Sequence, residues 1–505
     1  MGINKLLSSL KTKKGVVFPL LLIGILIFIT MPFFKDYMTY STLTGLVTKK
    51  TISIFINTIT QSSLSVFISL LIAIIPAFYI ANRKNLISKL TGQTIFIPFF
   101  FPSVSAGIVF SLLLRNTGLN YTLVAIVIAH VFYNSPIIVK YLSDSISSID
   151  HSLIESAKMD GASNILIFRK IIIPQIRDGL FRGIFLAYTY CFTSFAVILS
   201  VGNIKYSTFE TAITSALTGR INFSLVISYA VVQFTVLSII NSLIPRSHEI
   251  EKTYNKKKIK SNIIFIVITI IYVLFEWGVI IHSMAFSLFN NSGTIFAPYL
   301  TLFSREFNAK YHVIQSIVNS LSLSLIISII TTFFGYALVS HPAKITEKVI
   351  PSFFGISSAF LAITLYYCNI VYKIPMQLLL SIGIFIITIP IAYSFMYDNF
   401  KNFNYSIIES ARSDGANTFQ IFKHIKFPLL RGTIIGTMLQ IFTITYGEFT
   451  LSFSMKIQNM LPLSSVVNYS LGSMRLLKES AAMSSLNIII LLLIFNISSI
   501  ILKDD

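Results

Sequence analysis

Two stretches of the sequence share a pattern of charged, small and turn-forming residues. The first reads Glu-Ser-Ala-Lys-Met-Asp-Gly-Ala over 155–162, and the second reads Glu-Ser-Ala-Arg-Ser-Asp-Gly-Ala over 409–416. Each copy continues to a proline, Pro174 or Pro428, and the matching positions lie 254 residues apart. The chain contains neither His-Glu-x-x-His nor Gly-x-Ser-x-Gly, and its seven histidines lack metal-ligand spacing. The sequence therefore does not indicate hydrolytic or metal chemistry at these stretches.

Each repeated stretch has the features of a compact helix–turn–helix loop. Gly161 and Gly415 can end a first short helix, because glycine tolerates the positive φ that such a helix end needs. A second, amphipathic helix should follow, until the proline stops or bends it. The residues expected on this second helix are Ile165, Leu166, Phe168, Arg169 and Lys170 in the first copy, and Phe419, Ile421, Phe422 and Lys423 in the second. Apolar anchors on an exposed loop suit docking into a groove on a soluble partner.

The elements that must position these loops are membrane-spanning helices. The chain has 505 residues, of which 54% are hydrophobic and 11% are charged, whereas a soluble domain carries about 25% charged residues. The apolar residues form blocks of about twenty, a length that crosses a bilayer as a helix. We therefore expect an all-α polytopic membrane protein with about twelve transmembrane helices. The expected spans are 15–34, 52–80, 94–114, 119–139, 183–201, 224–244, 262–283, 313–339, 350–370, 376–397, 435–453 and 484–502.

The basic residues predict the orientation of these spans. The net charge is +20, and 27 of the 39 Lys and Arg lie in segments that face the cytoplasm if the N-terminus is inside. Since cytoplasmic loops are enriched in Lys and Arg, both termini are expected in the cytoplasm. A basic linker at 245–261 separates a first half, 1–244, from a second half, 262–505. The first span is too long for a cleaved signal peptide, and the span content excludes a nucleic-acid role.

At the two loops the sequence resembles the permease subunits of ABC-type importers. Both copies follow the EAA pattern of that family: Glu-x-Ala, three residues, Gly, nine residues, then Ile-x-apolar-Pro. The resemblance implies two homologous six-helix halves of the type I importer fold, with loops 143–182 and 401–434 acting as coupling helices on two copies of a cytoplasmic ABC ATPase. The residues that match or flank the motif are Glu155, Ala157, Asp160, Gly161, Ala162, Pro174, Glu409, Ala411, Asp414, Gly415, Ala416 and Pro428. A pair of generic amphipathic loops is the alternative interpretation.

The sequence carries no nucleotide-binding motif of its own. It contains no Gly-x-x-x-x-Gly-Lys-Ser/Thr loop and no Gly-Lys dipeptide, so a nucleotide cycle must come from another polypeptide. The resemblance implies a non-enzymatic subunit of the bacterial inner membrane, without a cofactor of its own, whose partner binds ATP. It also implies a substrate-binding protein on the outer face and transport by alternating access. A secondary transporter driven by an ion gradient is the alternative from another class, and it would need no duplicated loop.

Two further stretches bear on the substrate. Residues 190–217 and 446–482 look like the thiamine permease branch of the family, which sits close to the fused ferric-iron permeases. The resemblance therefore implies thiamine as the substrate, with ferric iron as the alternative. One departure concerns the third-span signature of the family, which is clear at 102–107 but lacks its glycine at 357–362.

Polar residues in the fifth and eleventh expected spans are candidates for the translocation pathway. They are Thr189, Thr193, Ser194, Thr443, Thr445 and Glu448. A carboxylate inside a span costs about 2.5–3.5 kcal/mol at the bilayer centre, so it usually faces a cavity or a partner. Glu448 is expected in the outer half of the membrane, where it either lines the cavity and favours a cation or bonds to neighbouring helices. We expect Glu276, Cys191 and Cys368 to be packing residues.

Overall fold

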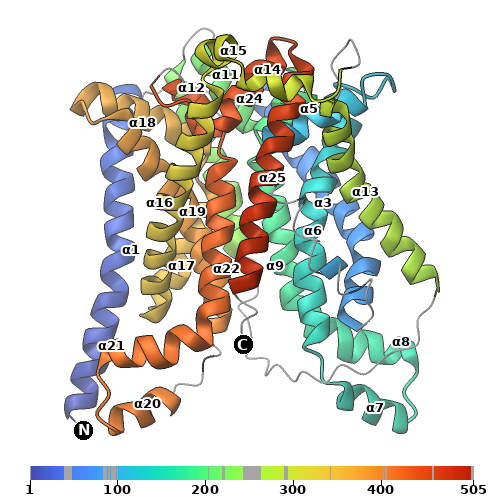
Figure 1. Cartoon of the computed structure of the whole chain (residues 1–505). Coiled ribbons are helices and arrows are strands. Elements are labelled where there is room, and N and C mark those ends of the chain that lie inside the picture. The colour runs from blue at the N-terminus through green and yellow to red at the C-terminus, as the bar shows by residue number, and fades with distance from the viewer. Residues whose placement is uncertain are drawn as a thin grey trace.

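The computed structural model describes residues 2–38, 48–82, 88, 91–92, 98, 101–202, 204–218, 222–242, 263–288, 294–341, 343–401, 403, 406–457 and 460–501. Long helices run between two ends of the molecule, and shorter helices lie at both ends (Figure 1). The helices of the first half are α1 (Gly2–Tyr37), α3 (Lys49–Asn82), α5 (Ser103–Leu113), α6 (Leu123–Ser147), α7 (His151–Met159), α8 (Asn164–Ile167), η3 (Phe168–Ile172), α9 (Ile173–Phe192), α10 (Ala196–Val201), η4 (Ile204–Tyr206), α11 (Phe209–Thr218) and α12 (Phe223–Ser242). The predicted linker at 245–261 lies outside the described residues.

The second half has a similar order of elements. Its helices are α13 (Ile263–Leu288), α14 (Ala297–Phe303), α15 (Arg305–Tyr311), α16 (Val313–Ser340), α17 (Lys344–Ser352), η5 (Phe353–Gly355), α18 (Ser358–Tyr372), α19 (Met376–Lys401), α20 (Ser406–Ser413), α21 (Thr418–Ile421), η6 (Phe422–Lys426), α22 (Phe427–Tyr446), α23 (Thr450–Ser454), α24 (Ser464–Ser473) and α25 (Leu477–Ile501). The prediction of an all-α polytopic membrane protein is confirmed.

The predicted count of twelve spans is not confirmed. Within the described residues, nine helices are long and apolar enough to cross a membrane, or ten if one bent pair counts as a span. That pair is Ile345–Gly355 with Ser358–Tyr372, bent by 92° in the region of the expected span 350–370. The bend has a local cause, because the Ser357 hydroxyl accepts a hydrogen bond from the Phe360 amide at 3.1 Å and starts a new helix.

Three more expected spans differ from straight membrane helices. The expected span 435–453 is broken, since α22 ends at Tyr446 and α23 begins at Thr450. The described part of the expected span 94–114 contains α5, which is 11 residues long. The expected span 183–201 is broken, since α9 ends at Phe192 and α10 begins at Ala196. The hydropathy of the sequence does not distinguish a short or broken helix from a straight span, because buried short helices and their connections are equally apolar.

The two halves repeat in structure as well as in sequence. The helices α8, η3 and α9 have counterparts α21, η6 and α22, each of which begins and ends 254 residues further along. The repeat includes a detail that hydropathy does not encode, namely a wide π-type turn directly before the proline of each copy. Such turns are rare, so their recurrence at the same offset indicates that the copies share one local fold.

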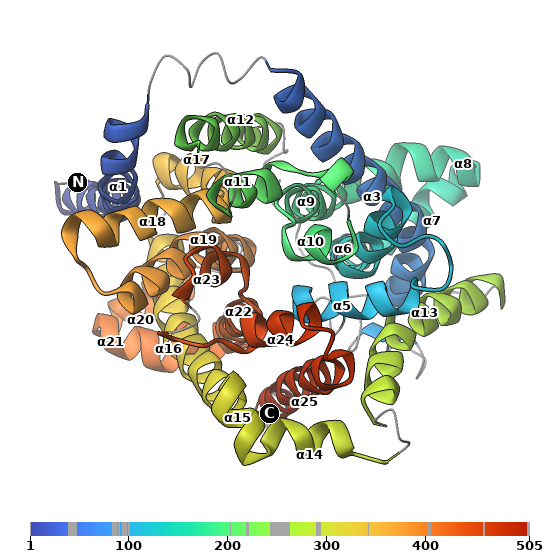
Figure 2. The ribbon, with the colours of Figure 1, turned by 90° about the horizontal axis from the view of Figure 1, so that it is seen from above.

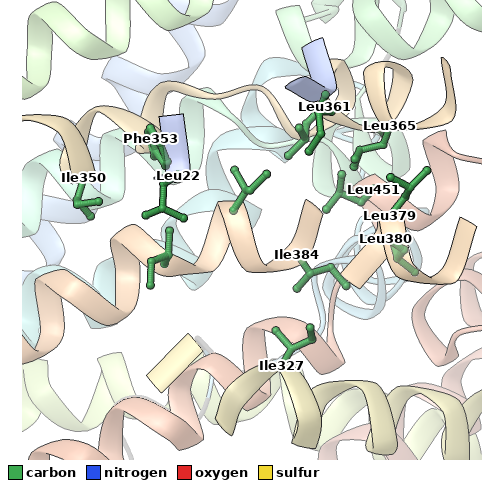
Figure 3. Close-up of a cluster of buried hydrophobic side chains, with 14 of the residues drawn as sticks. Leu22, Ile327, Ile350, Phe353, Leu361, Leu365, Leu379, Leu380, Ile384 and Leu451 are labelled. Carbon is green, nitrogen blue, oxygen red and sulfur yellow. The ribbon is translucent and has the colours of Figure 1, made fainter. Parts of the chain in front are cut away.

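The first long helix of each half packs against the other half. Leu22 and Ile29 of α1 belong to a buried apolar cluster whose other buried members come from the second half, including Leu361 and Leu379 (Figure 3). Conversely, Tyr272 of α13 belongs to a cluster built from α3, α6 and α9. The packing of α1 and α13 on the opposite halves buries apolar surface and so stabilises the contact between the halves. The halves also contact each other directly near the centre of the molecule (Figure 2).

Buried polar contacts join the halves near the end where α11 and α24 lie (Figure 1). The carboxylate of Glu210, on α11, accepts hydrogen bonds from the Gln233 amide at 2.7 Å and the Ala359 backbone N–H at 3.0 Å. The second contact places Glu210 at the N-terminus of α18 in the other half, where a negative charge is favourable. In the reverse direction, Asn468 of α24 donates to the Ser105 hydroxyl of α5 at 2.9 Å.

Candidate functional site

The two repeated loops have the same backbone geometry. Gly161 follows α7 with φ +79°, and Gly415 follows α20 with φ +85°. In the first loop the Ala162 N–H bonds the Ala157 carbonyl at 2.9 Å, and the Gly161 N–H bonds the Lys158 carbonyl at 3.1 Å. The second loop has the equivalent bonds at 2.9 and 3.0 Å. This pair of bonds is the Schellman motif, which ends a helix at a left-handed residue and favours glycine there.

A second short helix then begins with a side-chain cap in each loop. The Ser163 hydroxyl accepts from the Leu166 N–H, and Asn417 forms a capping box with Gln420. Both helices continue through the π turn into the long helices α9 and α22, whose second residues are Pro174 and Pro428. Proline lacks an N–H and clashes with the carbonyl four residues earlier, and a wider turn accommodates both. Each proline therefore follows a π turn, and the helix continues past it.

The predicted coupling residues lie at one end of the molecule, on α7 with its turn and on α20 with its turn (Figure 1). Their exposure matches between copies: the Glu, Asp and Gly positions are exposed, and the two Ala positions are partly buried. These residues are Glu155, Ala157, Asp160, Gly161 and Ala162, and Glu409, Ala411, Asp414, Gly415 and Ala416. The two loops thus present the same surface twice.

Each loop also exposes a large apolar side chain at an equivalent position. Ile165 is 80% exposed and Phe419, 254 residues later, is 69% exposed. Not all the predicted anchors behave this way, because Ile421 is 3% exposed and packs inward, as does Ile167 in the first loop. Helical spacing explains the difference, since a residue two positions further along a helix points to the opposite side. Ile165 and Phe419 are therefore the stronger candidates for contact with a partner.

A cavity of about 250 Å³ lies between the two halves. Five of the six predicted pathway residues line it: Thr189, Thr193, Ser194, Thr443 and Glu448. Thr445 is buried but is not among the lining residues. The helices around the cavity include α6, α9 and α10 of the first half and α19 and α22 of the second, which surround the centre of the molecule (Figure 2).

The breaks after α9 and α22 place side chains at the cavity wall. Ser194 and Glu448 occupy equivalent positions in these breaks, 254 residues apart. Phe195 and Phe449 come next in each half, and their rings stack across the halves with centroids 5.7 Å apart. The cavity is therefore lined by equivalent residues of the two halves.

The carboxylate of Glu448 is bonded to its own chain while it lines the cavity. It accepts from the Leu451 N–H at 2.6 Å, the Ser452 N–H at 3.2 Å and the Ser452 hydroxyl at 3.0 Å. Glu448 is 8% exposed, and these bonds hold the N-terminus of α23. Glu448 thus lines the cavity and is bonded to the short helix that follows it, and its preference for a cation stays a prediction.

The first half contributes two cavity residues that the sequence analysis missed, His130 and Asn134. One ring nitrogen of His130 lies 2.9 Å from the Ser194 hydroxyl and the other lies 3.3 Å from the Ser65 hydroxyl. The Asn134 side-chain amide donates to the His130 carbonyl at 3.0 Å. Both residues are 1% exposed. Their helix, α6, lies in the expected span 119–139, outside the fifth and eleventh expected spans that supplied the predicted pathway residues.

The three predicted packing residues are buried. Glu276 is 3% exposed and accepts from the Ser135 hydroxyl at 3.0 Å, which links α13 to α6. Cys191 and Cys368 are buried free cysteines. In the described part of the chain there is no group of three or more His, Cys, Asp or Glu arranged to hold a metal ion.

Comparison with known proteins identifies the family of the first half. Residues 69–248 match the family described as the binding-protein-dependent transport system inner membrane component. This segment is similar to the permease proteins that the family comprises. The resemblance that the EAA loop carried is thereby confirmed for the first copy, and the link of the second half to the family rests on the repeat.

The chain is also similar in sequence to individual transport permease proteins. The probable transport system permease protein NifC of Clostridium pasteurianum is 31% identical over 135 residues, which is 24% of this chain and 47% of the relative. The sulfate transport system permease protein CysT of Salmonella typhimurium is 27% identical, over 23% of this chain and 47% of the relative. The thiamine transport system permease protein ThiP of Haemophilus influenzae is 26% identical over 180 residues, 34% of each chain. The chain thus spans less than half the length of each of these relatives.

Proposed function

We propose that the chain is the membrane permease of an ATP-driven importer, in which residues 1–244 and 262–505 form two homologous halves. The observation that carries this proposal is the duplicated loop: two Schellman-capped helix–turn–helix units at one end of the molecule, each with an exposed apolar residue at the same position. A transporter driven by two identical ATPase subunits needs two equivalent docking surfaces on one face, and a secondary transporter does not. The loops would lie in the cytoplasm, with both termini on that side of the bacterial inner membrane.

The remaining components follow from this assignment. Two copies of an ABC ATPase dock on α7–α8 and α20–α21, and a substrate-binding protein docks on the opposite face. ATP binding brings the ATPases together, and the loops transmit this movement to α9 and α22, with which they are continuous. The cavity between the halves then opens alternately to the two sides. The partner binds ATP, and this chain provides the translocation pathway and the loops that couple it to the ATPases.

The substrate we propose is thiamine. Support comes from the likeness of residues 190–217 and 446–482 to thiamine permeases, and from the cavity itself. None of the cavity-lining residues, all within the described chain, is Lys or Arg, whereas Glu448 and several aromatic rings are present. Carboxylates and aromatic faces favour a cation, and a dianion such as sulfate would lack a charged partner here.

The test is uptake by proteoliposomes that contain this chain with its ATPase and its binding protein. ATP is supplied on the side of the loops, the binding protein on the other side, and labelled thiamine, ferric iron and sulfate are compared. We expect ATP-dependent accumulation of thiamine. Accumulation of iron or sulfate would overturn the proposed substrate but retain the importer, and uptake driven by an ion gradient without ATP would overturn the importer itself.

A further inference from the structure

An apolar groove with a volume of about 610 Å³ lies between α1 and the first part of α19. Its lining residues, all within the described chain, are apolar or glycine, and they include Leu21 and Phe28 of α1 and Phe385 of α19. The α1 wall is open to the outside, since Leu21 is 56% exposed and Phe28 is 50% exposed. Both helices belong to candidate membrane spans, Val16–Tyr37 and Met376–Tyr397, and α1 lies at the edge of the molecule (Figure 2). The groove therefore faces the hydrocarbon layer of the membrane.

In the other half, the chain itself fills the equivalent space. Phe275 and Val279 of α13 lie 254 residues after Leu21 and Ile25. They pack in a buried apolar cluster with Phe132 of α6, the counterpart of α19. The Phe275 and Phe132 ring centroids are 6.3 Å apart, and Val279 is 5% exposed, whereas its counterpart Ile25 is 39% exposed. The fold of the repeat thus allows this face of the helix to be buried, but α1 leaves it open to an occupant from outside the chain.

The lining of the groove determines the kind of occupant. Helices associate in membranes through small residues that allow close approach and through hydrogen bonds between polar side chains. The groove has one small residue, Gly24, no polar side chain, and otherwise branched or aromatic side chains. A second protein helix would therefore find neither close packing nor a hydrogen bond there. A flexible acyl chain needs neither, because it fills an irregular apolar surface through van der Waals contact alone.

The length and the ends of the groove indicate which leaflet supplies the acyl chain. The lining residues of α1 fall within 17–29, which is about 18 Å at 1.5 Å per residue, whereas the hydrocarbon core is about 30 Å thick. The groove is therefore only slightly longer than one leaflet is deep. At one end, Phe28 stacks on Tyr372 of α18 with ring centroids 5.0 Å apart. This end belongs to the leaflet opposite the two loops, because α18 lies at that end of the molecule (Figure 1).

A basic residue stands at this end of the groove. Lys373 is exposed and directly precedes Ile374, which lines the groove. In the last turn of α1, Lys35 is exposed as well, and the Asp36 carboxylate accepts a hydrogen bond from the Tyr367 hydroxyl. Two lysines and one acidic residue therefore lie at this end, and their charge favours a lipid with a negative phosphate group.

We propose that the groove is a lipid-binding site, which holds one acyl chain of an anionic phospholipid from the leaflet opposite the two loops, with the phosphate at Lys373. The acyl chain occupies the space between α1 and α19 that side chains fill between α13 and α6. It covers Leu21 and Phe28, and so it stabilises the packing of α1 on the second half. The site is separate from the central cavity and does not depend on the proposed transport function.

The test measures the phospholipid that the purified full-length chain retains. The chain is incorporated into bilayers of phosphatidylglycerol and phosphatidylcholine in equal amounts, extracted and washed in detergent, and analysed by native mass spectrometry and by lipid extraction. We expect the chain to retain phosphatidylglycerol in preference to phosphatidylcholine. Phosphatidylglycerol added back to the washed chain should raise its thermal unfolding midpoint.

Two equivalent glycines provide a matched pair of variants. Gly24 lines the groove, and Gly278 of α13 lies 254 residues later. No atom lies within 4 Å of the Cβ position at either glycine. Gly24→Leu puts a side chain into the groove and should lower lipid retention roughly tenfold. Gly278→Leu adds the same side chain to the equivalent helix and should retain phosphatidylglycerol within about twofold of the unmodified chain.

Lys373→Gln tests the headgroup contact and, as an exposed change, does not depend on how Gly24→Leu folds. Removal of this lysine should lower the preference for phosphatidylglycerol over phosphatidylcholine about fivefold. The control is Lys310→Gln, which removes an exposed lysine of α15 at the same end of the molecule (Figure 1). It should leave the preference unchanged.

The lipid site is wrong if the unmodified chain retains no phospholipid, if the two leucine variants retain equal amounts, or if Lys373→Gln and Lys310→Gln have the same lipid preference. A dimer of the unmodified chain that Gly24→Leu separates into monomers would assign the groove to a second copy of the chain and so overturn the lipid as its occupant. Uptake by the reconstituted complex judges the transport function separately, since lipid retention is measured on the chain alone.

Discussion

The glycines that end α7 and α20 allow a quantitative test of the proposed coupling role of the two loops. Gly161 and Gly415 have positive φ, and no atom lies within 4 Å of the position that a Cβ would occupy at either residue. Replacement by alanine therefore adds no steric contact, and its whole effect comes from the backbone. An L-residue in the left-handed region costs roughly 1–2 kcal/mol. The equilibrium constant for the native turn should fall roughly 5–30-fold in each loop.

Under the proposed function, both turns must be in the native conformation for the chain to hold two ATPases. In the double variant Gly161→Ala with Gly415→Ala, the equilibrium constant for having both native turns should therefore fall by the product of the two factors. The proline variants should be more severe. Proline fixes φ near −65° and removes the N–H that bonds the Lys158 or Arg412 carbonyl, at a cost of about 3 kcal/mol or more. Because the turns are exposed, membrane insertion and the helix core should remain intact.

The assay measures how much ATPase co-purifies with the tagged chain, and then compares ATP hydrolysis with substrate uptake in proteoliposomes. Gly118 provides the control. It has φ +71° with no atom within 4 Å of its Cβ position. It belongs to the connection between α5 and α6, and α5 lies at the end of the molecule opposite the loops (Figure 1). Gly118→Ala carries the same backbone cost and should retain the ATPase. The reasoning fails if the double variant keeps its ATPase and coupled uptake, or if Gly118→Ala loses as much ATPase as the loop variants.

Three other substitutions test the packing around the cavity. Glu448→Gln replaces one carboxylate oxygen by an amide nitrogen, which cannot accept a hydrogen bond from Ser452 or Leu451. It should destabilise the chain by about 1–3 kcal/mol and reduce transport. Unchanged transport affinity, transport rate and unfolding midpoint would contradict a pathway role. Glu210→Ala leaves Gln233 and the α18 N-terminus unpaired, and should lower stability by about 1–3 kcal/mol, whereas exposed Glu306→Ala should change it by less than about 0.5 kcal/mol. Gly107→Ala puts a Cβ 2.5 Å from Ser200 Cβ and should lower stability by about 1–3 kcal/mol, because it forces α5 away from α10. Gly278→Ala, with no atom within 4 Å of its Cβ position, should be tolerated. Thermal unfolding measures the stability of all these variants.

The local structure of the loops was predictable because their sequence signals are short-range. A glycine at a helix end, a capping residue and a proline act through neighbouring backbone atoms, and the same combination occurs twice. The helices α3, α16 and α19 were also predictable, since long apolar runs with little charge have few alternatives to a membrane helix. The bent and broken segments were not, because a re-entrant helix buried in protein has the hydropathy of a straight span.

The cavity was predictable only in part. The threonines and Glu448 are conspicuous in apolar segments, and five of the six predicted pathway residues line one cavity. His130 and Asn134 belong to a different helix, α6, and become neighbours of Thr189 only when α6 packs on α9. Such contacts depend on the rotation of each helix about its axis, which hydropathy alone does not determine for a helix that is apolar on most sides.

Equivalent positions of the two halves are alike in the loops and differ in the cavity. The loops remained alike, with matching glycines, caps and exposed apolar residues, as two identical docking partners would require. The cavity positions diverged: Ser194 bonds His130, whereas Glu448 caps α23. A substrate without two-fold symmetry cannot use two identical walls equally well, and fusion into one chain lets each wall change independently. Under the proposed function, symmetry is therefore expected at the two loops, and asymmetry at the cavity.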